Sequence, residues 1–379
     1  MAAFDVAIVG AGPVGAALAA LIAPGGRRCL VIEARDKPSR DARTLALSEA
    51  SRTLLERAGG WPAGSETPIV DIHVSQKGGP GRTLLTAQDG GVPALGYTVS
   101  YADVESALER RLGALGTEVR WGAPCERIEL GADASRVTLA GGECVEAKLL
   151  VLADGGANAK RIPGIAYSEK DYGQVAVTGP VSTDRPHGGR AYERFTPQGP
   201  VALLPKGDRF ALVWTATPAE GERLKALPDA AFLAELQAHF GDRAGRFVAV
   251  GPRAGFPLKL RTINSTIARR TVIVGNAAQA MHPIAGQGLN VGLRDAGTLA
   301  RLLESGGDPG DAAVLEAYRS SRTRDAGRGV AFTDFLVHAF ADGRRLPTWG
   351  RGLALTALDL LPPARRLLAA RMIHGAPSP

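Results

Sequence analysis

The feature that most constrains the fold is a glycine-rich turn between an apolar strand and a helix near the N-terminus. An apolar run over 4–9 leads directly into Gly10-Ala11-Gly12-Pro13-Val14-Gly15, and alanine and leucine then predict a helix over 16–23. A second apolar run, 29–32, ends on Glu33. A strand, a glycine turn, a helix and an acid about 20 residues further on form the dinucleotide-binding fingerprint, which a lone glycine motif would not establish.

The same residues indicate which dinucleotide is bound. Glycines at Gly10, Gly12 and Gly15 permit a tight turn and let a pyrophosphate approach the start of the helix. Glu33 can accept hydrogen bonds from both ribose hydroxyls. Because a carboxylate would repel a 2′-phosphate, we expect FAD or NAD at this site. The alternative is an ordinary strand-helix turn without a ligand.

Two later segments also have an apolar strand that ends at a glycine-containing turn. A buried-type strand over 149–153 ends at Asp154-Gly155 and is followed by Arg161. A short apolar strand over 272–274 breaks at Gly275-Asn276, crosses a loop that holds Pro283, Gly286 and Gly288, and restarts as a helix near Leu289. Such a loop leaves backbone N–H groups at a helix N-terminus free, which suits a polar-rimmed, anionic cofactor.

In order and spacing these three segments resemble those of the single-component FAD-dependent aromatic hydroxylases. Within that group, the sequences of 41–59, 275–296 and 353–372 resemble those of the UbiH/UbiF/VisC-type ubiquinone-biosynthesis hydroxylases. The resemblance is greatest to the UbiH branch, the 2-octaprenyl-6-methoxyphenol hydroxylases. The likeness covers nearly the whole chain, and it is less specific for the ring carbon than for the family. It implies an α/β fold, in which a Rossmann-like FAD-binding domain carries an inserted antiparallel-sheet substrate domain and C-terminal helices.

The chain order suggests where these parts lie. Runs over 174–181, 190–195, 201–204 and 210–215 are β-rich and have no helices between them, which predicts an antiparallel sheet, and one helix is expected over about 218–240. The tail over 312–372 is expected to be helical, with interruptions at Pro347 and Pro362-Pro363. We therefore assign 1–68, 97–170 and 257–310 to the FAD-binding domain, 69–96 and 171–256 to the substrate domain, and 311–379 to a C-terminal helical region.

Composition narrows the function classes. No apolar run reaches the roughly 20 residues of a membrane-spanning helix, and the chain enters its first strand at once, so we expect a cytoplasmic enzyme without a signal peptide. Its three cysteines are scattered, which argues against a metal cluster or a disulfide frame. The net charge of +7 comes from dispersed arginines without interleaved aromatics, so we expect no nucleic acid partner. An anionic cofactor and an anionic lipid or protein surface fit better.

The resemblance assigns roles to single residues. It places Arg43 near the FAD pyrophosphate and Asp154 in support of the cofactor, whereas a solvated arginine and a strand-end aspartate are the plain alternatives. Asn276 stands where the wider group more often has an aspartate for the ribityl chain, and Tyr101 stands where many relatives have an arginine or glutamine. The segment Gly286, Gln287, Gly288 and Asn290 is expected to donate hydrogen bonds to the flavin, and Pro283 to lie along the ring face. His282 is the expected catalytic histidine, and its alternative role is to fix the loop backbone.

The chemistry that follows is oxygen transfer. Reduced flavin and O2 would form a C(4a)-hydroperoxide that hydroxylates an electron-rich ring, so we expect a monooxygenase acting on a polyprenylated phenol in ubiquinone biosynthesis. A hydroxylase of a small soluble phenol, and a non-catalytic flavin- and lipid-binding subunit, are the alternatives. Because the sequence has no second complete fingerprint, we expect NAD(P)H to bind transiently as electron donor, and a protein donor is the alternative. The basic, apolar helices over 353–372 suit a membrane surface at its inner face, a quinone-biosynthesis complex, or packing on their own domain.

Overall fold

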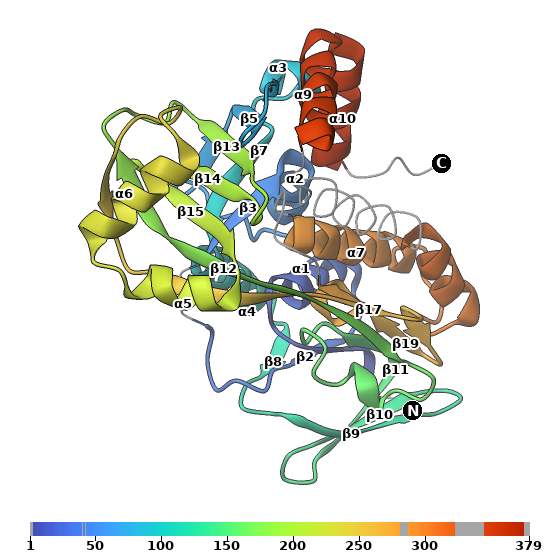
Figure 1. The fold of residues 1–379 in the computed structure, drawn as a ribbon. Coiled ribbons are helices and arrows are strands. Elements are labelled where there is room, and N and C mark those ends of the chain that lie inside the picture. Colours follow the sequence, from blue (N-terminus) through green and yellow to red (C-terminus); the bar gives the residue numbers. More distant parts are fainter. Residues whose placement is uncertain (1–2, 40, 42, 281–286, 323–344, 375–379) are drawn as a thin grey trace.

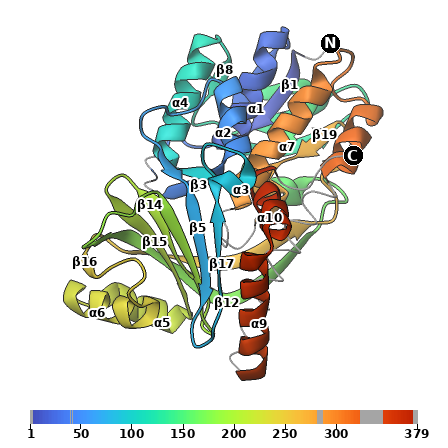
Figure 2. The same cartoon turned by 90° about the horizontal axis from the view of Figure 1, so that it is seen from above.

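A computed structural model describes residues 3–39, 41, 43–280, 287–322 and 345–374. Three sheets organise this part of the chain. Sheet A and its helices lie at one end of the molecule, sheet C with helices α5 and α6 lies at the other, and the small sheet B lies between them (Figures 1 and 2). The α/β class and the inserted antiparallel sheet expected from the sequence are therefore confirmed.

Sheet A is built on five parallel strands with the spatial order β19-β11-β1-β2-β8. Their apolar side chains are buried on both faces, as is usual when helices cover a parallel sheet. The antiparallel β18 adds to β19 at the edge, and the β9–β10 hairpin pairs with β11. The bounds are β1 (Phe4–Val9), β2 (Cys29–Ile32), β8 (Glu118–Arg120), β9 (Cys125–Leu130), β10 (Ser135–Leu139), β11 (Cys144–Leu152), β18 (Ile267–Ala268) and β19 (Thr271–Ile273).

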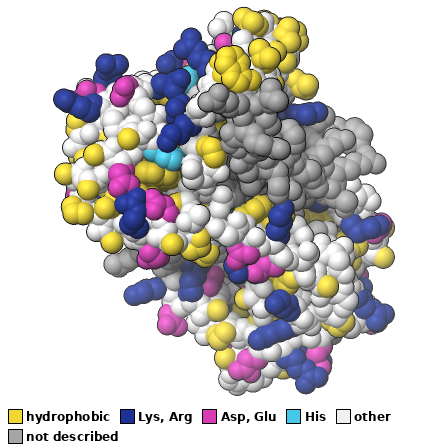
Figure 3. Space-filling view, in the orientation of Figure 1, with side chains coloured by type: hydrophobic (Ala, Val, Ile, Leu, Met, Phe, Trp, Pro, Cys, Tyr) yellow, Lys and Arg dark blue, Asp and Glu magenta, His cyan; other side chains and the backbone are white. Residues whose placement is uncertain are grey.

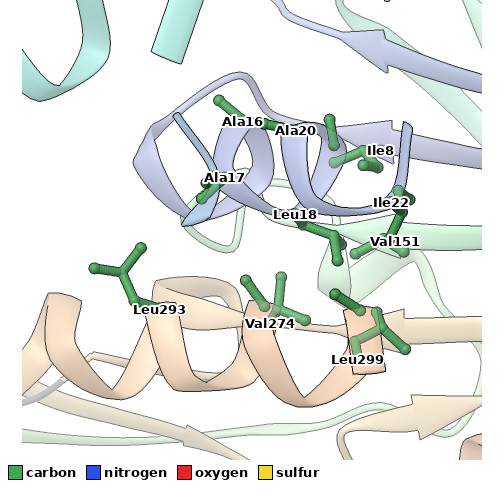
Figure 4. Close-up of a cluster of buried hydrophobic side chains, with 14 of the residues drawn as sticks. Ile8, Ala16, Ala17, Leu18, Ala20, Ile22, Val151, Val274, Leu293 and Leu299 are labelled. Atoms are coloured by element: carbon green, nitrogen blue, oxygen red, sulfur yellow. The ribbon is translucent and has the colours of Figure 1, made fainter. Parts of the chain in front are cut away.

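Helices α1 (Pro13–Ile22) and α7 (Gln287–Leu303) pack against each other over one face of sheet A. Figure 4 shows Leu18 and Ile22 of α1 in one cluster with Val151 of β11 and with Leu293 and Leu299 of α7. Helix α4 (Tyr101–Ala114) and helix α2 (Glu49–Arg57) complete this layer, and η1 (Ala23–Gly25) ends α1. This cluster fixes the N-termini of α1 and α7 relative to each other.

Sheet C has the order β20-β17-β12-β15-β14-β13-β5-β6, with β16 also paired to β12. All of its pairs are antiparallel except β5 with β13. The bounds are β5 (Asp71–Gln76), β6 (Arg82–Thr86), β12 (Tyr167–Thr183), β13 (Arg190–Phe195), β14 (Val201–Lys206), β15 (Arg209–Ala216), β16 (Phe247–Val250), β17 (Ala254–Ile263) and β20 (Gln279–Ala280). The sequence-based borders at 170/171 and 256/257 fall inside the continuous strands β12 and β17.

One face of sheet C is covered by α5 (Pro218–Ala226) and α6 (Asp229–Phe240). A single helix was expected here, and that expectation is wrong. Leu227 takes an extended conformation, with ψ 143°, because it precedes Pro228, so the helix stops and restarts. Apolar residues of the two helices then pack onto alternate residues of the strands.

Sheet B joins the two ends of the molecule through β3 (Thr44–Ser48), β4 (Thr67–Ile69) and β7 (Gly96–Ser100). The sequence analysis assigned no strand to 44–48, so β3 was missed. Ser48 ends β3 and caps α2, since its hydroxyl accepts a hydrogen bond from the N–H of Ser51 at 3.3 Å. The short helix α3 (Ala87–Gly90) follows β6.

Two helices close the described chain, α9 (Arg345–Leu360) and α10 (Pro362–His374). Pro347 lies in the first turn of α9 and does not interrupt it, while Pro362 opens α10, because a missing N–H costs nothing at a helix start. Helix α9 lies along β6, where the Thr83 hydroxyl donates to the Leu355 carbonyl at 2.7 Å. Helix α10 is held by an ion pair between Arg365 and Asp89 of α3, at 3.2 Å.

Candidate functional site

The fingerprint turn requires two of its glycines for steric reasons. Gly10 has φ 111°, and a Cβ there would lie 2.5 Å from the carbonyl oxygen of Ala153 on β11. A Cβ at Gly15 would lie 2.1 Å from the carbonyl oxygen of Gly10. Strand β1, the turn and α1 can therefore pack this closely only with glycine at both positions.

The N-terminus of α1 is open at Gly12, the remaining glycine of the fingerprint. Gly12 is the N-cap, no side chain caps the helix, and Pro13 follows as its first residue. A Cβ at Gly12 would meet a single atom within 4 Å, the hydroxyl oxygen of Tyr101 at 3.4 Å. An uncapped helix N-terminus with free space in front of it suits an anion, so the chain's residues fit the pyrophosphate of a dinucleotide here.

Glu33 stands beside this turn and is only 6% exposed. Its carboxylate accepts hydrogen bonds from the Ala11 N–H at 2.8 Å and from Nε of Arg35 at 3.0 Å. Burial alone would raise the pKa of Glu33, but the bonds from Arg35 and Ala11 outweigh it and lower the pKa below its usual value. The acid is therefore ionised, as an acceptor for ribose hydroxyls should be.

Arg35 was not singled out from the sequence, yet it organises two buried acids. Its guanidinium also lies 2.9 Å from the carboxylate of Glu105 on α4, which is almost fully buried. The only local signal was an arginine two residues after the fingerprint acid. The partner on α4 is separated by 70 residues, so this bridge could not be read from spacing.

Arg43 lies among aromatic side chains near the open end of α1. It pairs with Asp41 at 2.6 Å, and its guanidinium carbon is 5.4 Å from the ring centre of Tyr101 and 5.8 Å from that of Phe256 on β17. Burial raises the pKa of Tyr101 to about 12, so its hydroxyl is neutral and can donate to an acceptor. The residue that departs from the family pattern thus still brings a hydrogen-bond donor to Gly12.

Asp154 supports its own loop. Its carboxylate accepts from the N–H of Gly156 at 2.9 Å, from the N–H of Asn158 at 2.8 Å and from the Asn158 side chain at 2.7 Å. Arg161, at the end of η2 (Ala159–Arg161), donates to the carbonyl of Cys125. Arg161 thus binds the backbone of β9, whereas Asp154 binds its own loop. The Asp154 backbone abuts Gly10, which puts this loop beside the fingerprint turn.

The glycine segment that begins at Gly275 is held in place by a buried acid, Asp295. Gly275 begins η3 (Gly275–Ala277) with φ 61°, and its N–H donates to Asp295 of α7 at 2.9 Å. Asp295 also accepts from Gln279 at 3.1 Å and from Arg322 at 2.6 Å. The Asn276 side chain is exposed. Asp295 thus fixes the turn, and the exposed amide beside it is free to face a ligand.

The first turn of α7 is tied to sheet B. The side-chain oxygen of Asn290 accepts from the N–H of Ser48 at 2.9 Å and from the hydroxyl of Ser51 at 2.7 Å, and its amide donates to the Ala46 carbonyl at 3.0 Å. These bonds tie the first turn of α7 to β3 and α2. Gln287 and Gly288 form the start of this helix. His282, Pro283 and Gly286 lie outside the described residues.

Comparisons with known proteins agree with this geometry. The family model described as an FAD binding domain matches residues 3–333. The chain is 38% identical to the ubiquinone hydroxylase UbiL of Rhodospirillum rubrum over 378 residues, covering 96% of this chain and 88% of that one. It is 33% identical to the 3-demethoxyubiquinol 3-hydroxylase of Escherichia coli, covering 94% of each.

The chain belongs to the UbiH/UbiF/VisC-type family of FAD-dependent hydroxylases. As a member of this family it is an FAD-dependent monooxygenase. Its fold is similar to that of p-nitrophenol 4-monooxygenase PnpA from Pseudomonas putida, with a TM-score of 0.79 at 18% identity over the whole of both chains. Within the described residues, no helix is both long and apolar enough to cross a bilayer.

Proposed function

We propose that this monooxygenase hydroxylates the aromatic ring of a polyprenylated phenol in ubiquinone biosynthesis, with O2 as co-substrate and NAD(P)H as transient electron donor. The observation that carries the proposal is the position of the apolar face of sheet C that lies opposite α5 and α6. Phe256 of that face contacts Arg43, and Arg43 contacts Tyr101 in front of Gly12. A ring that lies on this face would be next to a flavin held by the glycine segments.

In this proposal the chain's residues hold the cofactor at three points. Gly10, Gly12 and Gly15 admit the pyrophosphate, Glu33 accepts from the ribose, and Arg43 neutralises phosphate charge. The loop of Asp154, the amide of Asn276 and the backbone around Gly286, Gln287, Gly288 and Asn290 receive the ribityl chain and flavin edge, with Pro283 along the ring and His282 near the reacting atoms. When bound and reduced, FAD would supply the chemistry that activates O2 for transfer of one oxygen atom to the ring.

The protein's own contribution is orientation, exclusion of water and electrostatics. Half-buried Val74 and Leu204 offer an apolar surface on sheet C for the ring and for the start of an isoprenoid chain, next to Ile72, which packs against α10. The N-terminus of α7 directs its positive end at the segment where negative charge would develop. Both features favour a hydrophobic phenol over a charged substrate.

The experiment that tests the function combines a gene deletion with a purified enzyme. Loss of the gene should accumulate a prenylphenol that lacks one hydroxyl, visible by mass spectrometry of the quinone extract. Wild type should restore the product and Gly12→Ala should not, since a methyl group there fills the space in front of α1 while touching only Tyr101. An unchanged quinone profile after deletion would refute the ubiquinone role, and turnover of short phenols alone would favour the small-phenol alternative.

We further propose that α9 and α10 rest on a membrane surface, from which the substrate is taken. Trp349, Leu353 and Leu360 are 59%, 67% and 72% exposed, and their spacing puts them on one side of α9. Leu361, between the two helices, and Leu367 on α10 are also exposed, and Figure 3 shows hydrophobic side chains gathered over these helices. Apolar contacts flanked by arginines are typical of helices that lie in a lipid interface.

A vesicle flotation assay tests this placement. Wild-type protein should float with vesicles of phosphatidylcholine containing phosphatidylglycerol, and Leu353→Glu with Leu360→Glu should sediment, because both changes put charge into the apolar surface. Ala354→Glu, at an exposed position on another side of the same helix, is the matched control. Equal flotation of both variants would refute a lipid contact. Binding only in the presence of another quinone-biosynthesis protein would assign the surface to a complex.

A further inference from the structure

Sheet C has two chemically different faces. Val177, Leu203, Leu212 and Trp214 point to one side, where α5 and α6 cover them. Because side chains alternate along a strand, their sequence neighbours point to the opposite side. We call this opposite side the substrate face, and in the five central strands it carries Ile72, Val74, Ala176, Thr178, Ala191, Glu193, Ala202, Leu204, Ala211 and Val213.

One acid stands in the middle of this face. The strand registers connect one row of residues across seven strands of the sheet, each paired with the next: Ala254, Thr178, Val213, Ala202, Glu193, Val74 and Thr83. Every residue in the row except Glu193 is uncharged. The carboxylate is therefore surrounded along the row by Ala, Val and Thr side chains.

The substrate face is turned toward the cofactor cradle. Phe256 is two residues from Ala254 on β17, so both side chains lie on the same side of the sheet. The guanidinium carbon of Arg43 is 5.8 Å from the ring centre of Phe256, and Arg43 also contacts Tyr101. Glu193 thus shares its face with residues that reach the open N-terminus of α1.

Within the described chain, no hydrogen bond or ion pair is formed by the Glu193 side chain, which is half-buried. Neighbouring elements bring charged groups to this side of the sheet, and each of these has a partner elsewhere. Lys206 donates to the Ser65 carbonyl, Arg209 pairs with Asp208, Arg351 contacts Gln76, and Asp359 accepts from the Leu84 N–H. Desolvation alone raises the pKa of Glu193 to about 7.

An unpaired acid on an apolar binding face needs a hydrogen-bond donor to offset its burial. We propose that Glu193 is a catalytic residue that binds the hydroxyl group of the phenol substrate and accepts its proton as the ring is hydroxylated. This inference rests on the proposed function, and it assigns one residue to the hydroxyl group of the phenol.

The proposed step transfers one proton from the phenol to the Glu193 carboxylate. The phenol O–H bond breaks, a new O–H bond forms on the Glu193 carboxylate, and the negative charge moves from the carboxylate to the phenolate. The phenolate is the more electron-rich ring, so its carbon is a better nucleophile toward the oxygen that the flavin supplies. A base whose pKa lies near working pH is well matched to this task.

The test uses the FAD-loaded enzyme with 2-geranylphenol and its methyl ether. In wild type, kcat/KM should fall below about pH 7 as Glu193 becomes protonated. Glu193→Gln should lower kcat/KM at pH 8 by about 10²-fold or more and remove this acid limb, while Glu193→Asp should retain the limb. Glu222→Gln, an exposed acid on α5 across the same sheet, is the control and should behave as wild type.

A binding measurement separates this inference from the proposed function. By calorimetry, wild type should bind 2-geranylphenol about 10-fold or more tightly than the methyl ether, and Glu193→Ala should abolish the preference. A preference that persists without turnover would refute the hydroxylase assignment for that phenol and still support Glu193 as its hydroxyl ligand. Equal affinity for the two ligands in wild type, or an unchanged acid limb in Glu193→Gln, would overturn the proposal.

Discussion

The turn at Gly275 depends on a buried ion pair whose removal has a calculable cost. Asp295 and Arg322 are 1% and 4% exposed, and their closest atoms lie 2.6 Å apart. Asp295→Asn keeps an oxygen for the Gly275 N–H but leaves the arginine buried without its counter-charge. Breaking one half of such a pair costs about 3–5 kcal/mol. At about 2 °C per kcal/mol for a large chain, the melting temperature should fall by roughly 6–10 °C.

The decisive comparison is the double variant Asp295→Asn with Arg322→Met. It removes both charges and keeps a side chain of similar length in the arginine's place, so most of the loss should be recovered. Thermal unfolding of wild type, both single variants and the double variant gives the coupling free energy directly. A double variant whose loss equals the sum of the two single losses would refute the assignment of this stability to the ion pair.

Three further outcomes follow from the same structure. Gly10→Ala puts a Cβ 2.5 Å from a backbone carbonyl at φ 111°, so the purified protein should retain little FAD and unfold at lower temperature; full FAD content would contradict this. Tyr101→Phe should weaken FAD binding by about 10-fold through the lost hydroxyl, with an unchanged melting temperature, as measured by flavin fluorescence titration; undiminished affinity would exclude the contact. Burial opposes ionisation of Asp89, but hydrogen bonds and Arg365 lower its pKa below the usual 3.8. Its stabilisation is therefore complete above pH 3.8 and is lost as the pH falls below that value, so hydrogen exchange in α10 should rise there in wild type and already at neutral pH in Asp89→Asn.

Much of the fold could be predicted because its signals are local. The glycine spacing after β1, the acid at the end of β2 and the β-rich runs of sheet C each lie within a few residues of one another. The same holds for Asp154, which supports a loop four residues long through its own neighbours. The sequence-based domain borders stay a prediction.

Other features depend on contacts between distant residues. The side chain of Asn290, which stays a predicted cofactor ligand, also bonds to Ala46, Ser48 and Ser51, some 240 residues away in sequence. Glu193 has no motif around it. Only the registers of five strands show that it faces the cofactor side of sheet C. Spacing alone could reveal neither.

The strand order of sheet A has a consequence for synthesis on the ribosome. β1 lies between β2 and β11, and β11 in turn pairs with β19, so strands near residues 4, 144 and 271 must meet. The helix that covers them, α7, ends only at Leu303. Sheet C is likewise incomplete until β17 has been made. Both halves of the enzyme should therefore finish folding together near the end of translation, and FAD should enter an almost complete polypeptide.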